Sequence, residues 1–107
     1  MVINQYEIFW VNLDPTIGHE IKKTRPCVII SPDELNHNIG TVMIAPVTSA
    51  IKTYPSRVVC NIQSKKGTIM LEQIRAVDKR RLLNKIEKLS AKEILQVKRV
   101  IKEMLVD

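Results

Sequence analysis

The sequence has few of the residues from which metal sites and phosphate-binding loops are usually built. Only three of its 107 residues are glycine, so it contains no glycine-rich loop of the kind that cradles nucleotide phosphates. Its two histidines, His19 and His37, are far apart in the chain, and its two cysteines do not form a CxxC pair. Since no zinc-binding motif is present, we expect neither a metal ion nor an organic cofactor.

Long apolar runs are also absent. No stretch approaches the roughly 20 apolar residues that a membrane-spanning helix needs, and Met1 is not followed by a basic-then-apolar leader. We therefore expect a cytoplasmic protein that does not contact a membrane. In that reducing compartment Cys27 and Cys60, each inside an apolar run, are expected to be buried thiols, although the sequence leaves a disulfide between them open.

Positive charge is what the sequence has in excess. It contains 17 Lys and Arg against 11 Asp and Glu, for a formal net charge of +6. The excess lies mainly in residues 75–107, which carry ten basic and five acidic side chains. This balance favours a polyanionic partner such as a nucleic acid, with a merely solvated, Lys-rich surface as the alternative. The length predicts a single domain, residues 1–107.

Five short apolar segments predict a mainly β fold. They are rich in β-branched residues, bounded by turn residues, and span 6–13, 26–31, 41–48, 57–62 and 68–74. Pro46 in the third segment indicates an edge strand or a bulge. Residues 76–89 fit either a helix or a strand, and we favour a turn at 78–81 followed by a final strand.

The end of the chain predicts one amphipathic helix. Ser90 followed by Glu93 forms a capping box. A single helical stripe then holds the apolar residues Ile94, Val97, Ile101, Met104 and Leu105. The first strand is apolar on both faces, so we expect the barrel interior to cover one face and a helix or a second subunit the other. The whole pattern predicts a small, mostly antiparallel barrel with a helical lid.

The polar loop of residues 14–25 is the first candidate for a functional site. It ends at Arg25, immediately before Pro26 and a buried strand, where a rigid backbone would present the planar guanidinium to a phosphate. An ion pair with Glu20 or Glu72 is the alternative. Thr48 ends another buried strand, where its hydroxyl could instead bond its own backbone. Both residues stand at strand-to-loop junctions, which in a small barrel can lie at one rim.

The chain resembles the MazF/PemK (Kid) toxins of bacterial toxin–antitoxin systems along nearly its whole length. The resemblance rests on the segments IFWVNLDPT, GHE, RP before VIISP, IAPVTS and LEQIRAVDK, in this order and at these intervals. It implies an SH3-like barrel, a homodimer, and ribosome-independent, metal-independent cleavage of single-stranded RNA at a short sequence. It also implies a cognate antitoxin, for which we expect an acidic, disordered tail that folds across the basic surface.

Several site residues follow from the same resemblance. Arg25 and Thr48 match the two catalytic positions of the family. The expected RNA contacts, from matching positions or from the two polar loops, are His19, Glu20, Thr24, Ser49, Lys52, Glu72 and Gln73. The chain departs from many relatives at Ile21-Lys22-Lys23-Thr24, where they have Gln and Gly, so the resemblance does not transfer a target sequence.

RNA supplies its own nucleophile, since its 2′-OH lies beside the scissile phosphate. The resemblance therefore implies products with a 2′,3′-cyclic phosphate and a 5′-OH. Arg25 and Thr48 would stabilise charge on the phosphoryl oxygens, and His19, Glu20 and Glu72 could share proton transfer. Two alternatives remain at this stage: a non-enzymatic toxin that binds DNA gyrase, as in the CcdB family with the same fold, and a regulator that binds RNA without cutting it.

Overall fold

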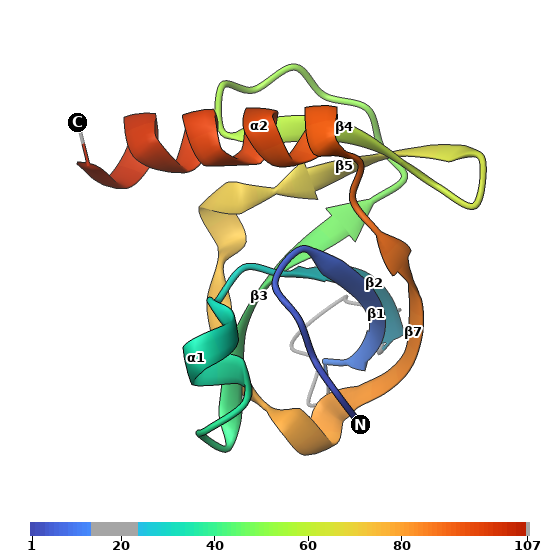
Figure 1. The fold of residues 1–107 in the computed structure, drawn as a ribbon. Helices are drawn as coiled ribbons and strands as arrows, with labels where there is room; N and C mark the ends of the chain where they lie inside the picture. The colour runs from blue at the N-terminus through green and yellow to red at the C-terminus, as the bar shows by residue number, and fades with distance from the viewer. Residues whose placement is uncertain (14–23, 107) are drawn as a thin grey trace.

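The chain folds as a curled antiparallel sheet crossed by a C-terminal helix (Figure 1), in a computed structural model that describes residues 1–13 and 24–106. The strands are β1 (Glu7–Asn12), β2 (Thr24–Ile29), β3 (Thr41–Thr48), β4 (Arg57–Ile62), β5 (Lys65–Met70), β6 (Arg75–Asp78) and β7 (Leu82–Lys88). The helices are α1 (Asp33–Asn36), α2 (Ala91–Ile101), the 3-10 turns η1 (Leu71–Gln73) and η2 (Lys79–Arg81), and a π-helical turn, η3 (Lys102–Val106). The predicted mainly β, antiparallel fold with a C-terminal helix is thus confirmed, with the sheet curled into a half-barrel.

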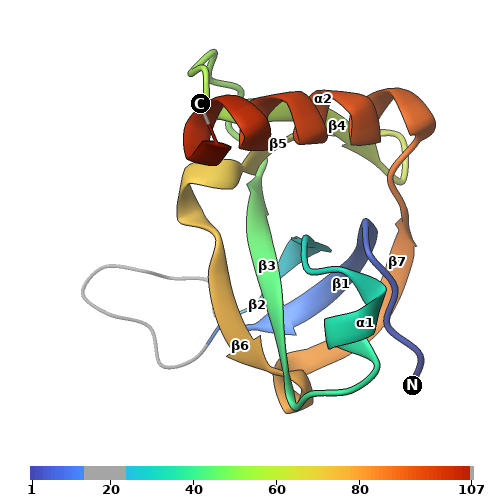
Figure 2. The same ribbon diagram turned by 60° about the vertical axis from the view of Figure 1, so that its left-hand side comes forward.

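Strand β3 joins the two parts of the sheet. One of its edges pairs with β2, and its other edge pairs first with β6 and then with β5 (Figure 2). Pro46 lies between Ile44, the last residue paired with β6, and Val47, the first paired with β5. The predicted edge position is therefore wrong, because β3 is an interior strand. Pro46 is accommodated because it lies where the side of β3 away from β2 changes its partner from β6 to β5.

The two faces of the sheet bury separate apolar cores. Alternation along β1 puts Phe9 and Val11 inside the curl with Cys27 and Ile29 of β2. The opposite face packs under α2, whose Val97 is fully buried in the second core. A helix of the same chain therefore covers the outer face of β1 beside Ile8. Of the two covers expected from the sequence, a helix or a second subunit, this face has the helix.

The fifth predicted strand, 68–74, is wrong in its bounds. Strand β5 begins at Lys65, because Gln63 and Ser64 adopt positive φ values of 50° and 68° and close a tight hairpin with β4. The chain then leaves the sheet through η1 and returns as β6 beside β3. The predicted turn at 78–81 and the final strand after it are confirmed by η2 and β7.

Helix α2 begins where the sequence predicts. Ser90 Oγ accepts a hydrogen bond from the Glu93 N–H at 3.2 Å, and Glu93 Oε1 accepts one from the Ser90 N–H at 2.8 Å. The predicted apolar stripe holds only as far as Ile101, since Met104 and Leu105 are exposed in η3. No helix among residues 1–13 and 24–106 has the length and apolar character needed to cross a membrane.

Candidate functional site

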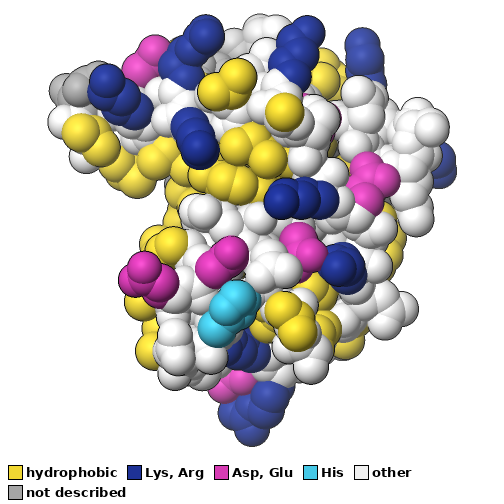
Figure 3. Space-filling view, in the orientation of Figure 1, with side chains coloured by type: hydrophobic (Ala, Val, Ile, Leu, Met, Phe, Trp, Pro, Cys, Tyr) yellow, Lys and Arg dark blue, Asp and Glu magenta, His cyan; other side chains and the backbone are white. Residues whose placement is uncertain are grey.

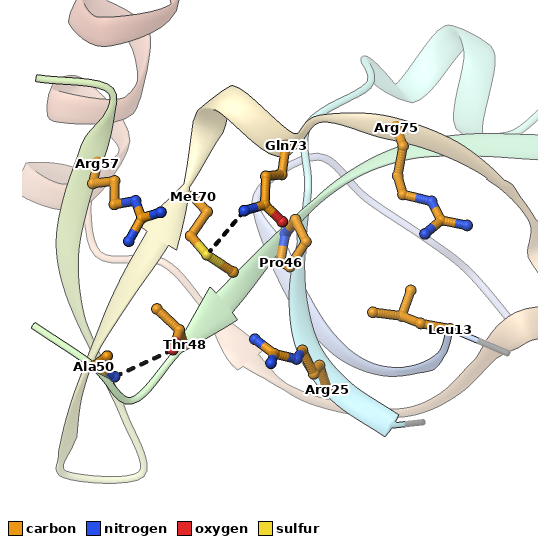
Figure 4. A pocket seen from close by; sticks show the side chains of 9 residues that line it. All are labelled: Leu13, Arg25, Pro46, Thr48, Ala50, Arg57, Met70, Gln73 and Arg75. Carbon is orange, nitrogen blue, oxygen red and sulfur yellow. Dashed lines mark hydrogen bonds between the residues drawn. The ribbon is translucent and has the colours of Figure 1, made fainter. Parts of the chain in front are cut away.

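A pocket of about 340 Å³ opens beside β3 on the face of the sheet away from α2 (Figure 4). Its walls come from residues far apart in the sequence that the strand pairing brings together. They are Leu13, Arg25, Pro46, Thr48, Ala50, Arg57, Met70, Gln73 and Arg75. Three of these side chains are arginines and none is acidic, so the lining that the structure describes suits an anion.

Arg25 lies in β2 opposite Val11 and enters the pocket beside Thr48 (Figure 4). It is half-buried, and it forms no ion pair with any carboxylate in the described part of the chain. In particular Glu72, one alternative partner from the sequence, pairs with another arginine. The guanidinium therefore keeps its donors available for a ligand.

Thr48 ends β3, and its Oγ1 accepts a hydrogen bond from the Ala50 N–H at 3.2 Å. The alternative drawn from the sequence, a hydroxyl bonded to its own backbone, thus holds as well. This bond occupies one lone pair of the oxygen and leaves the hydroxyl proton to be donated into the pocket. Arg25 and Thr48, although far apart in the chain, line one pocket.

Arg57 is fixed at one end of the pocket by a carboxylate and a ring. Its Nε and Nη2 donate to Glu72 Oε2 at 3.1 and 2.8 Å, and its guanidinium lies 4.7 Å from the centre of the Tyr54 ring. Ser56 Oγ donates to the other oxygen of Glu72 at 2.8 Å. Partial burial would raise the pKa of Glu72, but the hydrogen bonds from Arg57 and Ser56 outweigh it and hold that pKa below its usual value.

The rest of the lining is an apolar floor with polar groups at its edge. Pro46 and Met70 are buried side chains of β3 and β5. Gln73 lies over them with its Nε2 3.6 Å from the Met70 sulfur (Figure 4). Arg75, exposed at the start of β6, has no ion pair with a described carboxylate. The pocket thus combines a surface for a flat apolar group with several donors for an anion.

The structure brings some predicted site residues together and not others. Gln73 lies in the pocket with Arg25 and Thr48, while Glu72 reaches it only through Arg57. Three others, all exposed, do not line the pocket: Thr24, Ser49 and Lys52. His19, Glu20 and the loop that carries them lie outside the described residues.

Sequence reasoning missed Arg57 and Arg75 as parts of the site. Both are the first residues of strands that follow a turn or loop. The rule that singled out Arg25 and Thr48, a polar side chain at a strand-to-loop junction, applies equally to Arg57. Applied to every strand, the same rule would have found it.

The two cysteines are buried thiols, as predicted. Neither forms a disulfide, and burial raises the pKa of Cys27 and of Cys60 to about 12. No group of three or more His, Cys, Asp and Glu side chains in the described residues is arranged to hold a metal ion.

The chain is similar to known proteins along most of its length. The profile of the PemK-like, MazF-like toxins of type II toxin–antitoxin systems matches residues 4–105. Endoribonuclease MazF9 of Mycobacterium tuberculosis is 35% identical over 106 residues, covering 90% of each chain. Endoribonuclease toxin MazF of Escherichia coli is 34% identical over 71 residues, which are 66% of this chain and 64% of that protein.

The fold matches solved structures of the same kind. The crystal structure of MazF from Deinococcus radiodurans is 27% identical with a TM-score of 0.83, covering 100% of this chain and 99% of that one. A mycobacterial endoribonuclease in complex with its cognate antitoxin has the same TM-score at 14% identity, covering 97% and 95%, and shows the likeness of fold alone. On the profile match and the mycobacterial relative, the chain belongs to the family of PemK-like, MazF-like toxins of type II toxin–antitoxin systems.

Proposed function

We propose that this chain is an endoribonuclease toxin that cuts single-stranded RNA, mRNA included, at a short sequence without a ribosome or a metal ion. The observation that carries the proposal is the joint presence of Arg25 and Thr48 in one pocket whose described lining has no carboxylate. A guanidinium with no ion pair to a described carboxylate, beside a hydroxyl that can donate its proton, suits the charge of a phosphodiester.

The reaction we propose uses the nucleophile of the substrate. The 2′-oxygen attacks the adjacent phosphorus, the bond from phosphorus to the 5′-oxygen breaks, and the ends are a 2′,3′-cyclic phosphate and a 5′-OH. Arg25 and Thr48 donate to the phosphoryl oxygens, where negative charge grows in the transition state. A well-placed donor of this kind contributes about 3–4 kcal/mol in comparable sites.

Proton transfer needs a group that is neither always charged nor held ionised. Arg25 is a poor base, because a guanidinium keeps its proton at any usable pH. Glu72 is also a weak base, since Arg57 and Ser56 lower its pKa, and we assign it the role of holding Arg57 in place. The family resemblance puts His19 and Glu20 near the bound RNA, and on that ground we assign to them the transfer of the proton from the 2′-oxygen to the leaving 5′-oxygen.

The remaining RNA contacts and the partners are part of the same proposal. Gln73 and Arg75 flank the phosphate site, and Thr24, Ser49 and Lys52 contact RNA beyond the pocket. The toxin acts as a homodimer in the cytoplasm, where mRNA is available. An acidic, disordered antitoxin segment occupies the arginine-lined pocket and excludes RNA, folding as it binds.

The test is cleavage of a long single-stranded RNA by purified protein in EDTA, with the new ends mapped. Arg25→Ala should lower kcat/KM by about 100-fold or more, and Arg25→Lys should recover only part of the loss because lysine lacks the planar fork. Thr48→Ala should lower it by about tenfold or more. The cut ends should carry 5′-OH groups, and a 2′-deoxy substitution at the cut site should abolish cleavage.

Matched controls come from the same residue types elsewhere. Arg99→Ala on the exposed side of α2 and Thr41→Ala at the far end of β3 should cleave like the wild type. Full activity in Arg25→Ala and Thr48→Ala would disprove the site assignment. A wild-type protein that leaves RNA intact under all these conditions would disprove the enzyme.

A further inference from the structure

Thr68 of β5 has a buried hydroxyl that nothing in the described residues satisfies. The residue is fully buried, and its Oγ1 is the side-chain polar atom that is buried without a hydrogen-bond partner in that part of the chain. Such an atom lowers the stability of a fold, so its presence calls for a reason.

The strand register puts this hydroxyl next to the proposed catalytic threonine. Thr68 lies directly opposite Thr48 in the antiparallel pair of β3 and β5. Directly opposed residues project from the same face of a sheet, with Cβ atoms about 4.5–5.5 Å apart, and opposed threonines can hydrogen-bond.

The preceding pair shows which face this is. Val47 and Ile69 are opposed one step along the ladder, and both are buried in the core under α2. Thr48 and Thr68 therefore project from the other face, the one that Met70 presents to the pocket two residues further along β5. Thr68 therefore stands beside Thr48 on the face of the sheet that bears the pocket, although it does not itself line the pocket.

Thr48 has room for one more donor. Its Oγ1 already accepts from the Ala50 N–H, and a hydroxyl oxygen has two lone pairs. If Thr48 donates its proton to a phosphoryl oxygen, the second lone pair is still free. A turn of Thr68 about its Cα–Cβ bond would allow it to fill this position.

We propose that Thr68 is a positioning residue for Thr48. This inference rests on the proposed ribonuclease function. In the RNA complex the Thr68 hydroxyl donates to Thr48 Oγ1, while Thr48 donates to the scissile phosphate. Hydrogen bonds in such a chain polarise one another, so Thr48 becomes a stronger donor as charge develops on the phosphate.

The proposal separates activity from stability. Thr68→Val removes the hydroxyl at nearly constant volume, so it should raise the melting temperature by a few degrees, since no buried hydroxyl is left unpaired. The same change should lower kcat by about 3- to 10-fold with KM within about twofold, because the lost hydrogen bond is stronger in the transition state, where charge develops on the phosphate, than in the bound substrate. Thr68→Ser keeps the hydroxyl and should keep kcat near the wild-type value.

A double-mutant cycle tests whether Thr68 acts through Thr48. Thr48→Val combined with Thr68→Val should be no slower than Thr48→Val alone, because Thr68 then has no hydroxyl to support. Thr41→Val, in β3 but away from the pocket, is the control for loss of a strand hydroxyl and should leave kcat and KM unchanged. Thr68→Ala is a second variant without the hydroxyl.

Each outcome decides the matter. A wild-type kcat in Thr68→Val, or equal losses in Thr68→Ser and Thr68→Val, would overturn the inference and leave the ribonuclease proposal intact. Additive losses in the cycle would also overturn it, because Thr68 would then act independently of Thr48. If the wild-type protein cuts no RNA, the proposed function itself fails. If the wild type is active and the Arg25 and Thr48 variants are impaired while Thr68→Val is not, the inference about Thr68 alone fails.

Discussion

Arg57 and Glu72 hold each other at the edge of the pocket, so each charge decides where the other lies. Two guanidinium donors meet one carboxylate oxygen, and Ser56 donates to the other. The result is an arginine that lines the pocket with its charge already balanced. Arg25 and Arg75 have no such partner among the described carboxylates. At the scale of single residues, the pocket therefore has arginines of two kinds.

This pairing makes stability depend on pH through Glu72. The pKa of Glu72 is lower in the folded chain than in the unfolded one, so its contribution is complete above the ordinary glutamate pKa of about 4.3. The contribution is lost as the pH falls through the lower, folded-state value. Glu72→Gln should thus lower the unfolding free energy at pH 7 by at most about 1 kcal/mol, the range for a solvent-screened pair, and the melting temperature should fall accordingly. Near pH 3 the difference should shrink, as thermal melts at both pH values would show.

The control for this measurement is Glu103→Gln, an exposed glutamate in η3. It should melt like the wild type at both pH values. Asp78 also has a lowered pKa, through hydrogen bonds from Arg80, but it is present in every variant and cancels in the comparison. A Glu72→Gln penalty that is the same at pH 3 and pH 7 would contradict the assigned role.

At the scale of elements, the close approach of β5 to β3 depends on Gly67. A Cβ at this position would lie 2.8 Å from Val47 Cγ1 and 3.3 Å from the Thr48 carbonyl oxygen. Gly67→Ala should force the strands apart beside Thr48, at a cost of about 1–3 kcal/mol in unfolding free energy. Denaturant unfolding measures that cost, and RNA cleavage should fall as Thr48 shifts.

Gly40, just before β3, is the matched comparison. A Cβ there would meet nothing within 4 Å, so Gly40→Ala should leave stability and cleavage nearly unchanged. If the two alanine variants proved equally stable, strand packing at Gly67 would not be what holds Thr48 in position.

The same region shows how far sequence patterns reach. Strand-like runs and the capping box at Ser90 located most strands and the start of α2, because local alternation and capping are properties of neighbouring residues. The end of β5 at Met70 and the η1 turn that follows it, both inside the predicted strand 68–74, could not be seen this way. Only the pairing of β6 with β3, remote in sequence, decides where the chain leaves the sheet.

Some residues of the candidate site could likewise be found from local sequence, whereas others depend on strand pairing. Arg25 and Thr48 were found because each ends a polar loop or a strand, and the family resemblance supplied their roles. The same junction rule flags Arg57 as a candidate. That Arg57 and Arg75 share a pocket with Arg25 depends on the register of β4, β5 and β6, which no local pattern contains. The partner of Glu72 was likewise set by packing, since the fold brings Arg57 to it rather than Arg25.

At the scale of the whole molecule, the net charge of +6 does not describe the pocket. Lys and Arg side chains stand out along the top of the molecule over α2 (Figure 3), whereas the arginines that line the pocket come from β2, β4 and β6. The charge excess in the sequence predicted a nucleic acid partner, but part of that excess lies on α2 and not in the pocket. Cations on α2 can attract RNA at long range, whereas contacts in the pocket release counterions from particular phosphates.

Salt dependence separates these two contributions. For single-stranded RNA, each phosphate neutralised adds about 0.7 to the slope of log K against log salt concentration. With an RNA made uncleavable by 2′-O-methyl groups, Arg75→Gln should reduce the slope by about 0.7, because its charge is not balanced by a described carboxylate. Arg57→Gln should change the slope by much less, since Glu72 already neutralises that guanidinium.

The control is Lys98→Gln, exposed on α2, which should leave the slope unchanged. Titrations monitored by fluorescence anisotropy at several salt concentrations would measure the slope for all three variants. Equal reductions in all three variants would mean that RNA binding depends on total charge rather than on the pocket.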